Sequence, residues 1–420
     1  MEDKISRYIM DRKEAIKSLK VEERLIRIPL TKDFIISLIG PRRAGKTYFL
    51  YQLIKNKKIN DEDYLFVNFE EIEGSLESFI SKHQEIYGKP PKFLFLDEIQ
   101  SLKNWEKEVY RVFEKKKFYI FLTGSSSRFL SKEIATQLRG RSLTIKVFPF
   151  SFREILSIYG LKKEFYTSEE IGRVKNLLRA KLKEGLFPDI ALKKVEASSF
   201  ISEFIDLIIY RDIMERYGVK NISALEFFTK NSIASNSSVF SVNKIYNTMK
   251  SLGIKVSKNT LYNFQRFLED VNSIFFLKKY SKSIKEVELS LPKAFVVDNS
   301  LYTFTTYKLD TGILMESFVF QELLKLGYEV NKNLYYIGDT HEVDFIILEK
   351  DRVKQLIQVT YASSKDEIKN RETNSLLKVS ELLRCKNLSI ITWDYEDELR
   401  INNKTIKCIP LWRWLLRYNK

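Results

Sequence analysis

The stretch Gly40-Pro41-Arg42-Arg43-Ala44-Gly45-Lys46-Thr47 decides how this chain folds. It matches the pattern GxxxxGK(S/T), follows the apolar run Phe34–Ile39 and precedes a helix-like segment, Thr47–Lys55. A glycine-rich loop between a strand and a helix directs backbone N–H groups and a helix N-terminus at one point, which is how proteins hold a phosphate. The sequence therefore predicts a nucleotide-binding loop. We expect the nucleotide to contact Gly40, Pro41, Arg42, Arg43, Ala44, Gly45, Lys46, Thr47 and Tyr48.

Two side chains of this loop have distinct chemical tasks. Lys46 supplies a positive charge to the β- and γ-phosphates, and the Thr47 hydroxyl is a ligand for Mg²⁺. A partner motif follows about 50 residues later, where the apolar run Phe93–Leu96 ends in Asp97 and Glu98. Ligands sit at this end of the strands in open α/β sheets. We expect Asp97 to hold Mg²⁺ through water and Glu98 to polarise the attacking water; the alternative for Glu98 is a solvated strand end.

Further polar residues follow the next apolar run. It ends in Thr123-Gly124-Ser125-Ser126-Ser127, and we expect one hydroxyl, that of Ser125, to contact the γ-phosphate or the attacking water. A turn rich in Gly and Ser is the competing interpretation. Arg139 and Arg141 are candidates for an arginine finger, in cis or from a neighbouring subunit, that stabilises charge on the transferring phosphoryl group. The competing interpretation is a surface arginine pair.

The rest of the chain predicts an α/β fold. Short apolar runs alternate with amphipathic segments up to Phe148, which is typical of a parallel sheet covered on both faces. The pattern is helical from Phe150 to about Tyr217, with apolar residues three and four positions apart. After Met315 a second α/β unit begins. The runs assigned to further strands of the first sheet are Tyr64–Phe69, Phe118–Leu122 and Leu143–Phe148.

Composition limits the possible functions. The chain has 420 residues, and 71 Lys and Arg against 55 Asp and Glu give a net charge of +16. Such a surplus favours an anionic partner such as nucleic acid or nucleotide, although solubility alone is an alternative. Two cysteines, Cys385 and Cys408, and two histidines are too few for a disulfide framework or a zinc site. We expect a cytoplasmic protein, because the N-terminus lacks a signal peptide and no apolar run approaches membrane-spanning length.

Taken together, the motifs resemble one family. GPRRAGKT, LFLDEIQSLKNWE, TGSSSRFLSKEIATQLRGR and FPFSFREIL resemble the prokaryotic AAA-type P-loop ATPases related to the signal-transducing STAND group. The resemblance implies a P-loop ATPase domain over residues 1–150, a helical lid over 151–217, a winged helix over 218–290 and a nuclease-like α/β domain over 291–420. Gly185-Leu186-Phe187-Pro188 resembles the family's Gly-x-x-Pro lid motif, which implies that Pro188 lies near the nucleotide; Glu184 stands where a first Gly is usual.

The expected winged helix carries a net positive charge. Between Ser241 and Ser290 there are nine Lys and Arg against four Asp and Glu. The second helix of such a unit, here Lys258–Val271, enters the major groove of DNA. The alternative is a winged helix used only for packing within the chain. The residues we expect to contact DNA are Lys258, Asn259, Tyr262, Asn263 and Arg266.

The C-terminal unit resembles a PD-(D/E)XK nuclease fold with an altered site. Asp344 stands where the fold has its Asp, and Glu316 is the candidate acid on a helix. Gln358 replaces the second acid, and Thr360 replaces the Lys that assists the attacking water. We therefore expect a nuclease-like fold without nuclease activity.

These observations favour a Mg²⁺-dependent ATPase whose nucleotide state repositions the winged helix and the C-terminal domain, with double-stranded DNA as the expected partner. The alternative is a DNA-binding or signalling scaffold in which ATP is a switch or structural ligand. A protein partner and a homo-oligomer are open possibilities, and no membrane association is expected.

Overall fold

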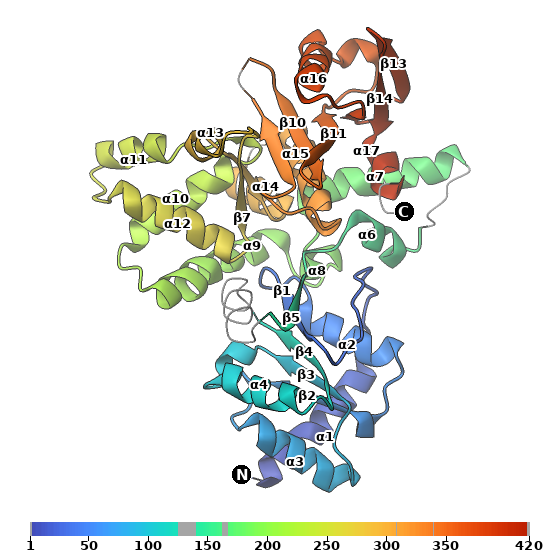
Figure 1. The fold of residues 1–420 in the computed structure, drawn as a ribbon, viewed down its shortest axis with the longest axis vertical. Coiled ribbons are helices and arrows are strands. Elements are labelled where there is room, and N and C mark those ends of the chain that lie inside the picture. The colour runs from blue at the N-terminus through green and yellow to red at the C-terminus, as the bar shows by residue number, and fades with distance from the viewer. Residues whose placement is uncertain (1, 125–139, 162–166, 308, 339, 418–420) are drawn as a thin grey trace. The chain divides into compact units, whose positions relative to one another are not determined.

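The computed structural model describes residues 2–124, 140–161, 167–307, 309–338 and 340–417 (Figure 1). Two compact units are present, the first made mainly by Met1–Pro149 and the second by Phe150–Glu269 and Ser273–Lys420. Each unit has its own apolar core, so each is described separately below.

The first unit is built on a five-stranded parallel sheet. The strands lie in the order β2-β3-β4-β1-β5, and every neighbouring pair is parallel, as the apolar runs predicted. The bounds are β1 Ile35–Ile39, β2 Tyr64–Asn68, β3 Phe93–Asp97, β4 Tyr119–Thr123 and β5 Ser142–Lys146.

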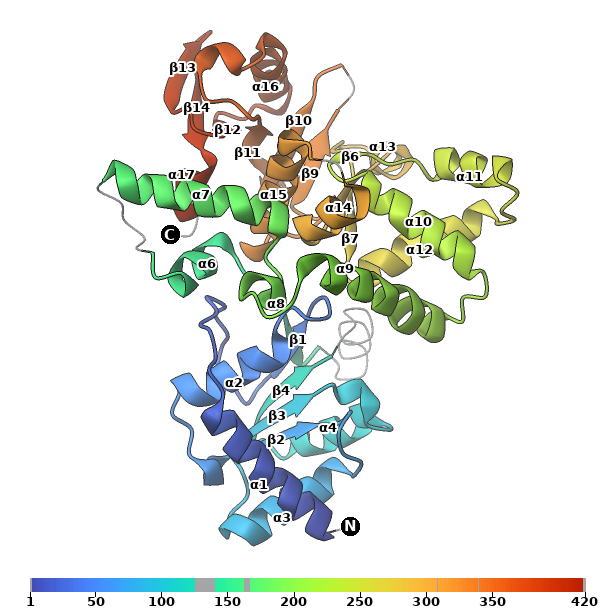
Figure 2. The same cartoon turned by 180° about the vertical axis from the view of Figure 1, so that it is seen from behind.

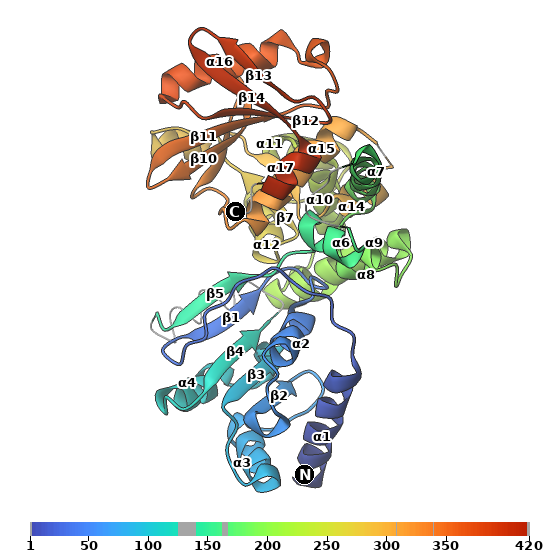
Figure 3. The same cartoon turned by 90° about the vertical axis from the view of Figure 1, so that its right-hand side faces the viewer.

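Helices cover both faces of this sheet. Alternate residues of β1 belong to different cores: Ile35 packs with α3 and α4, and Ile36 packs with α2 on the other face (Figure 3). This alternation is the two-residue period of a strand buried on both sides. The helices are α1 Glu2–Ser18, α2 Lys46–Asn56, α3 Leu76–Tyr87 and α4 Trp105–Glu114.

The second unit begins with helices and continues into a small antiparallel sheet. In this sheet β8 lies between β6 and β7. The domain boundary expected at residue 290 falls between β7 and β8, whose pairing continues the small sheet to Val296; the boundary itself stays a prediction. The elements are α6 Phe152–Ile158, α7 Ser168–Glu184, α8 Pro188–Ala191, α9 Ala197–Asp206, a π-helix Leu207–Glu215, α10 Ile222–Ala234, β6 Ser238–Val239, α11 Val242–Ser251, α12 Lys258–Asp270, β7 Ile274–Leu277, α13 Ile284–Leu289 and β8 Lys293–Val296.

A six-stranded mixed sheet completes the second unit (Figure 2). Its order is β13-β14-β12-β11-β10-β9, with β11, β12 and β14 parallel to one another. No element was expected at β13, β14 and α17; β13 and β14 form an antiparallel hairpin at one edge of the sheet, and α17 follows them. The bounds are α14 Asn299–Thr306, α15 Thr311–Lys325, β9 Leu334–Ile337, β10 Val343–Glu349, β11 Arg352–Val359, α16 Asn370–Leu383, β12 Leu388–Thr392, β13 Asp397–Ile401, β14 Lys404–Pro410 and α17 Leu411–Arg417.

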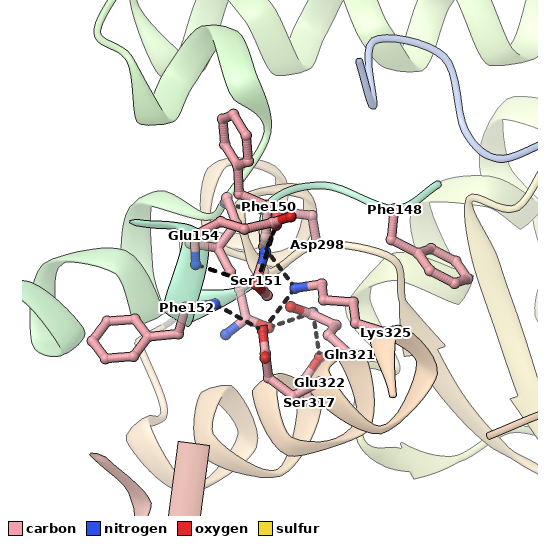
Figure 4. Close-up of polar contacts among 12 residues, drawn as sticks. Phe148, Phe150, Ser151, Phe152, Glu154, Asp298, Ser317, Gln321, Glu322 and Lys325 are labelled. Carbon is pink, nitrogen blue, oxygen red and sulfur yellow. Dashed lines mark hydrogen bonds and ion pairs between the residues drawn. The ribbon is translucent and has the colours of Figure 1, made fainter. Parts of the chain in front are cut away.

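Buried polar contacts join α6 to α15 inside the second unit (Figure 4). The Phe152 N–H donates to the Glu322 carboxylate at 3.2 Å. The Lys325 ammonium donates to the Phe150 carbonyl and to Glu322, both at 2.9 Å. Glu322 is 3% exposed, and burial raises the pKa of its carboxyl. The adjacent Lys325 ammonium offsets the free-energy cost of burying a charged carboxylate. The first helix of the expected lid is therefore fastened to a helix of the expected C-terminal domain.

Candidate functional site

The phosphate-loop backbone takes a shape that only glycine allows at its first position. Gly40 has φ of +148°, and a Cβ built there would lie 2.0 Å from the Val147 carbonyl oxygen. Gly45, at the N-terminal end of α2, has φ of +90°. The Lys46 ammonium donates to the Gly40 and Pro41 carbonyls at 3.1 and 2.9 Å, which holds it across the loop. The loop thus joins β1 to α2 as the motif predicted.

Asp97 is the centre of the site. Its carboxylate is fully buried at the end of β3 and accepts hydrogen bonds from the Thr47 hydroxyl at 2.9 and 3.1 Å. The Thr123 hydroxyl, from the end of β4, and the Asn68 amide, from the end of β2, also donate to it. Burial raises the pKa of Asp97 to about 6, although the hydrogen bonds oppose the shift. Three strand ends and the loop thus meet at one carboxylate.

Glu98 is held in an unusual backbone conformation next to Asp97. Its φ of +48° is left-handed, which non-glycine residues adopt uncommonly and often at functional positions. Its N–H donates to the Thr123 hydroxyl at 3.0 Å, and the Gln100 amide donates to its carboxylate. The side chain is half-buried beside the strand ends. Thr123 therefore fixes both acidic residues, whereas the hydroxyl role was expected of Ser125.

The residues at this edge fit a nucleotide with Mg²⁺. Mg²⁺ prefers oxygen ligands and takes most of them from phosphate and water, so one hydroxyl and one carboxylate, those of Thr47 and Asp97, are a sufficient protein contribution. Within the described ranges, no group of three or more His, Cys, Asp or Glu side chains is arranged to hold a metal ion.

Arg24 is a residue of this site that no motif indicated. Its guanidinium is 7% exposed and donates to the Ala44 carbonyl in the phosphate loop at 2.9 Å and to the Phe148 carbonyl at 2.7 Å. Its own backbone exchanges two hydrogen bonds with the Gln52 side chain on α2. Arg24 thus stabilises the phosphate loop from a segment that has no regular secondary structure. A buried arginine in an irregular segment has no sequence signature, so only the fold reveals it.

Of the two predicted arginine fingers and the predicted serine, Arg141 alone lies within the described residues. Ser125 and Arg139 lie outside the described residues. Arg141 directly precedes β5, its carbonyl accepts the Ile35 N–H at 2.9 Å, and its side chain pairs with Glu114. Since β1 and β5 are parallel, Arg141 lies at the amino edge of the sheet, about 15 Å of strand away from the phosphate loop. The arginine-finger role of Arg141, in cis or from a neighbouring subunit, stays a prediction.

Pro188 and its motif belong to the second unit. Pro188 is the first residue of α8, and the preceding Gly185 has φ of +84°. The buried Asp298 carboxylate accepts the Leu186 N–H at 2.7 Å, and a Cβ at Gly185 would lie 1.9 Å from Asp298. The motif is thus fixed by a contact within its own unit. A nucleotide contact of Pro188 stays a prediction.

The five residues expected to contact DNA form one exposed face of α12. Leu261, Phe264 and Phe267 pack inward, and the intervening polar positions are exposed. Tyr262, an aromatic residue on a surface helix, is 51% exposed. The exposed residues on this face are Lys258, Asn259, Tyr262, Asn263 and Arg266.

The residues of the altered nuclease-like motif line one pocket of about 640 Å³ in the second unit. Asp344 and Gln358 come from adjacent strands, and Glu316 from α15. An unpredicted residue, Lys293, donates to both Glu316 and Asp344. Burial raises the pKa of Glu316 to about 8 and also raises that of Asp344, and Lys293 opposes both shifts.

Comparison with known proteins divides the chain among three family models. The model described as an AAA domain matches residues 32–156. Two models described as domains of unknown function, DUF8612 and DUF4143, match residues 175–323 and 311–414. The AAA match covers the sheet, the phosphate loop and Asp97 described above.

Full-length relatives also exist. The uncharacterized protein MJ1544 of Methanocaldococcus jannaschii is 35% identical over 98% of this chain and 94% of its own length. An uncharacterized protein of Haemophilus influenzae is 28% identical over 92% of this chain and 95% of its own length. Both alignments thus extend over nearly the whole of this chain and of each relative.

Solved structures resemble the chain only distantly. Aeropyrum pernix ORC1 in complex with DNA aligns over 78% of this chain and 94% of that chain, with 12% identity and a TM-score of 0.29. AMPPCP-bound DnaA from Aquifex aeolicus aligns over 61% and 85%, with 14% identity and a TM-score of 0.23. Separately, none of the helices in the described ranges is long and apolar enough to cross a membrane.

Proposed function

This chain belongs to the family of the Methanocaldococcus jannaschii protein MJ1544, and we propose that it binds and hydrolyses ATP with Mg²⁺. The observation that supports this most directly is the meeting of Thr47, Asp97 and Thr123 beside the phosphate loop. Thr47 and Asp97 are the groups that a P-loop ATPase uses to hold its metal, and Thr123 also fixes the neighbouring Glu98.

Each residue has a task in the proposed reaction. Backbone N–H groups of the loop and the Lys46 ammonium bind the β- and γ-phosphates, and Arg24 keeps the loop in shape through the Ala44 carbonyl. Thr47 and Asp97 would hold Mg²⁺, which neutralises phosphate charge when it is bound. Glu98 accepts hydrogen bonds from the attacking water and orients it toward the γ-phosphorus. Thr123 fixes the positions of Glu98 and Asp97 relative to each other through its two hydrogen bonds.

The test is ATP hydrolysis by the wild type and by Glu98→Gln. We expect Glu98→Gln to lower kcat at least about 100-fold, because the amide accepts a proton poorly, while ATP affinity stays within about threefold. Glu85→Gln, an exposed change on α3, is the matched control and should leave kcat unaltered. If the wild type binds ATP without hydrolysing it, the alternative applies and ATP is a switch or structural ligand.

We further propose that α12 contacts double-stranded DNA. The order α10-β6-α11-α12-β7-β8 supports a winged helix, in which the helix equivalent to α12 lies in the major groove. The exposed face with Lys258, Tyr262 and Arg266 supports contacts to phosphates and base edges. DNA bound there would be the partner whose contacts change with the nucleotide state.

Salt dependence tests this second proposal. We expect Lys258→Ala with Arg266→Ala to weaken DNA binding and to reduce the slope of log K against log[salt] by about 2, one for each lost phosphate contact. Lys378→Ala with Arg384→Ala makes the same change of charge at exposed positions of α16 and its C-terminal end, and should leave the slope as in the wild type. Equal losses for both pairs would mean that only net charge matters and that α12 is no contact surface.

A further inference from the structure

One lysine in the second unit occupies the centre of three carboxylates. The Lys293 ammonium lies 3.0 Å from Glu316, 2.9 Å from Glu342 and 3.1 Å from Asp344. Lys293 is 2% exposed and Asp344 3%. A fully buried lysine is rare unless it is paired, and this one has three acidic partners. The three carboxylates therefore favour a cation at the position that this ammonium occupies.

The lysine reaches this position from a different sheet. Lys293 begins β8, which pairs with β6 at Val239 and with β7 at Leu277. The carboxylates belong to α15 and to the beginning of β10. Lys293 precedes Asp344 by 51 residues and is no part of the nuclease-like motif. The small antiparallel sheet thus supplies the counter-charge of the C-terminal pocket.

The same pocket contains an acceptor without a donor. Gln358, which lines it, is 7% exposed, and its Oε1 is buried with no hydrogen-bond partner. The second oxygen of Asp344 accepts the Val359 N–H at 2.9 Å, so each oxygen of this carboxylate accepts a hydrogen bond. Carboxylate oxygens, here from the buried Asp344, the partly buried Glu316 and the exposed Glu342, and a spare carbonyl oxygen are the hard ligands that Mg²⁺ or Mn²⁺ prefers. The ligand chemistry of a divalent ion is present, but an ammonium already stands among the oxygens.

We propose that Lys293 is the built-in cation of this pocket, and that its ammonium excludes a divalent metal ion from Glu316, Glu342 and Asp344. An ammonium and a divalent ion at these three carboxylates repel each other, and this repulsion adds to the cost of desolvating the metal. The pocket of the native chain is therefore metal-free. Removing the ammonium leaves the oxygens without a counter-charge and opens the pocket to a divalent ion.

The experiment counts Mn²⁺ ions bound by the full chain without nucleotide at pH 8, from the electron paramagnetic resonance signal of free Mn²⁺. The variants are Lys293→Met, Asp344→Asn, and the two combined. We expect Lys293→Met to bind one more ion per chain than the wild type, and the combined variant to lose it. The wild type and Asp344→Asn should bind equal numbers. Ions at the phosphate loop are common to all four proteins and cancel in the comparison.

Conservative variants complete the test. Lys293→Arg retains a cation and should bind no additional ion. Should Lys293→Met fail to fold, as judged by circular dichroism, Lys293→Gln replaces it, since its amide still donates to the carboxylates. An ion that the wild type binds and Asp344→Asn loses overturns the proposal. So does a folded Lys293→Met or Lys293→Gln protein that binds no more Mn²⁺ than the wild type.

Discussion

At the scale of single residues, the site depends on one hydroxyl that links two acids. Thr123 donates to Asp97 and accepts the Glu98 N–H, so it fixes a fully buried carboxylate and a residue in a left-handed conformation together. Hydrogen bonds to charged groups contribute more than neutral ones, about 1.5–3 kcal/mol each. Thr123 is therefore a positioning residue whose loss affects chemistry more than nucleotide binding.

Replacing Thr123 by Val tests this role, because the shape is kept and the hydroxyl is removed. We expect Thr123→Val to lower kcat at least about 10-fold, with KM changed less than about threefold. Thr144→Val on β5 is the matched control: Thr144 is exposed, and its loss should leave kcat unaltered. A fall in ATP affinity alone, with normal kcat, would contradict a positioning role.

A second residue-scale prediction concerns the dependence of stability on pH. His83 is fully buried on α3, with Nε2 3.1 Å from the Tyr64 carbonyl and Nδ1 without a partner. Burial, with Lys13 nearby, lowers its pKa from 6.5 to about 4. Between these values the unfolded chain binds the proton and the folded chain does not. The folded state should therefore lose about 2–3 kcal/mol of stability as pH falls from 6.5 to 4.

The two histidines of the chain provide the comparison for this measurement. His83→Gln keeps a donor for the Tyr64 carbonyl but does not titrate, so unfolding measured against pH should show a shallower loss below pH 6.5. His341→Gln alters the other histidine, which is exposed, and should follow the wild-type curve. Identical slopes for both variants would show that carboxylates alone cause the acid sensitivity.

At the scale of elements, the loop depends on how closely β1 and β5 approach. The strands are parallel, and the Val147 N–H after β5 donates to the Ile39 carbonyl at the end of β1 at 2.7 Å. Val147 thereby places its own carbonyl against Gly40. Gly40 is therefore required because the Val147 carbonyl approaches it closely, and not only because the phosphate loop follows it.

Gly40→Ala should therefore lower the free energy of unfolding by at least about 3 kcal/mol, since a backbone carbonyl 2.0 Å from the new Cβ has no room to move. Gly88→Ala is the control. Gly88 also has positive φ, +72°, but nothing lies within 4 Å of a Cβ there. Gly88→Ala should therefore lower the free energy of unfolding only by the strain of the left-handed conformation, about 1–2 kcal/mol. Denaturant unfolding measures both, and equal losses would contradict the close-approach argument.

At the scale of the whole molecule, the chain consists of two units with separate cores. The loop and its acids belong to the first unit, whereas Pro188, the α12 face and the Lys293 pocket belong to the second. A ligand stabilises the unit to which it binds by an amount that depends on its excess over Kd.

Calorimetric unfolding should therefore show two transitions, and ATP with Mg²⁺ should raise the first unit's midpoint more than the other's. At a 100-fold excess over Kd the shift should be about 5–10 °C. Lys46→Ala, which removes the phosphate contact, should abolish the shift. A single transition that moves as a whole with ATP would mean that the two units unfold as one.

The features that depend on local sequence pattern could be predicted before the fold was known. Apolar runs and the phosphate-loop motif predicted β1 to β4 and α2. Asp97 and Glu98 were predicted because two acids follow a buried strand. In each case the residues that decide the structure lie within about ten positions of one another, where period and turn chemistry are informative.

Only the tertiary structure decided the features that depend on partners distant in sequence. Strand order placed Arg141 at the amino edge and Thr123, rather than another hydroxyl, between Asp97 and Glu98. Packing placed Arg24 against a carbonyl 20 residues away and Lys293 against an acid 51 residues away. No period or motif encodes such pairs, because the energy of a buried ion pair or hydrogen bond depends on which elements pack together.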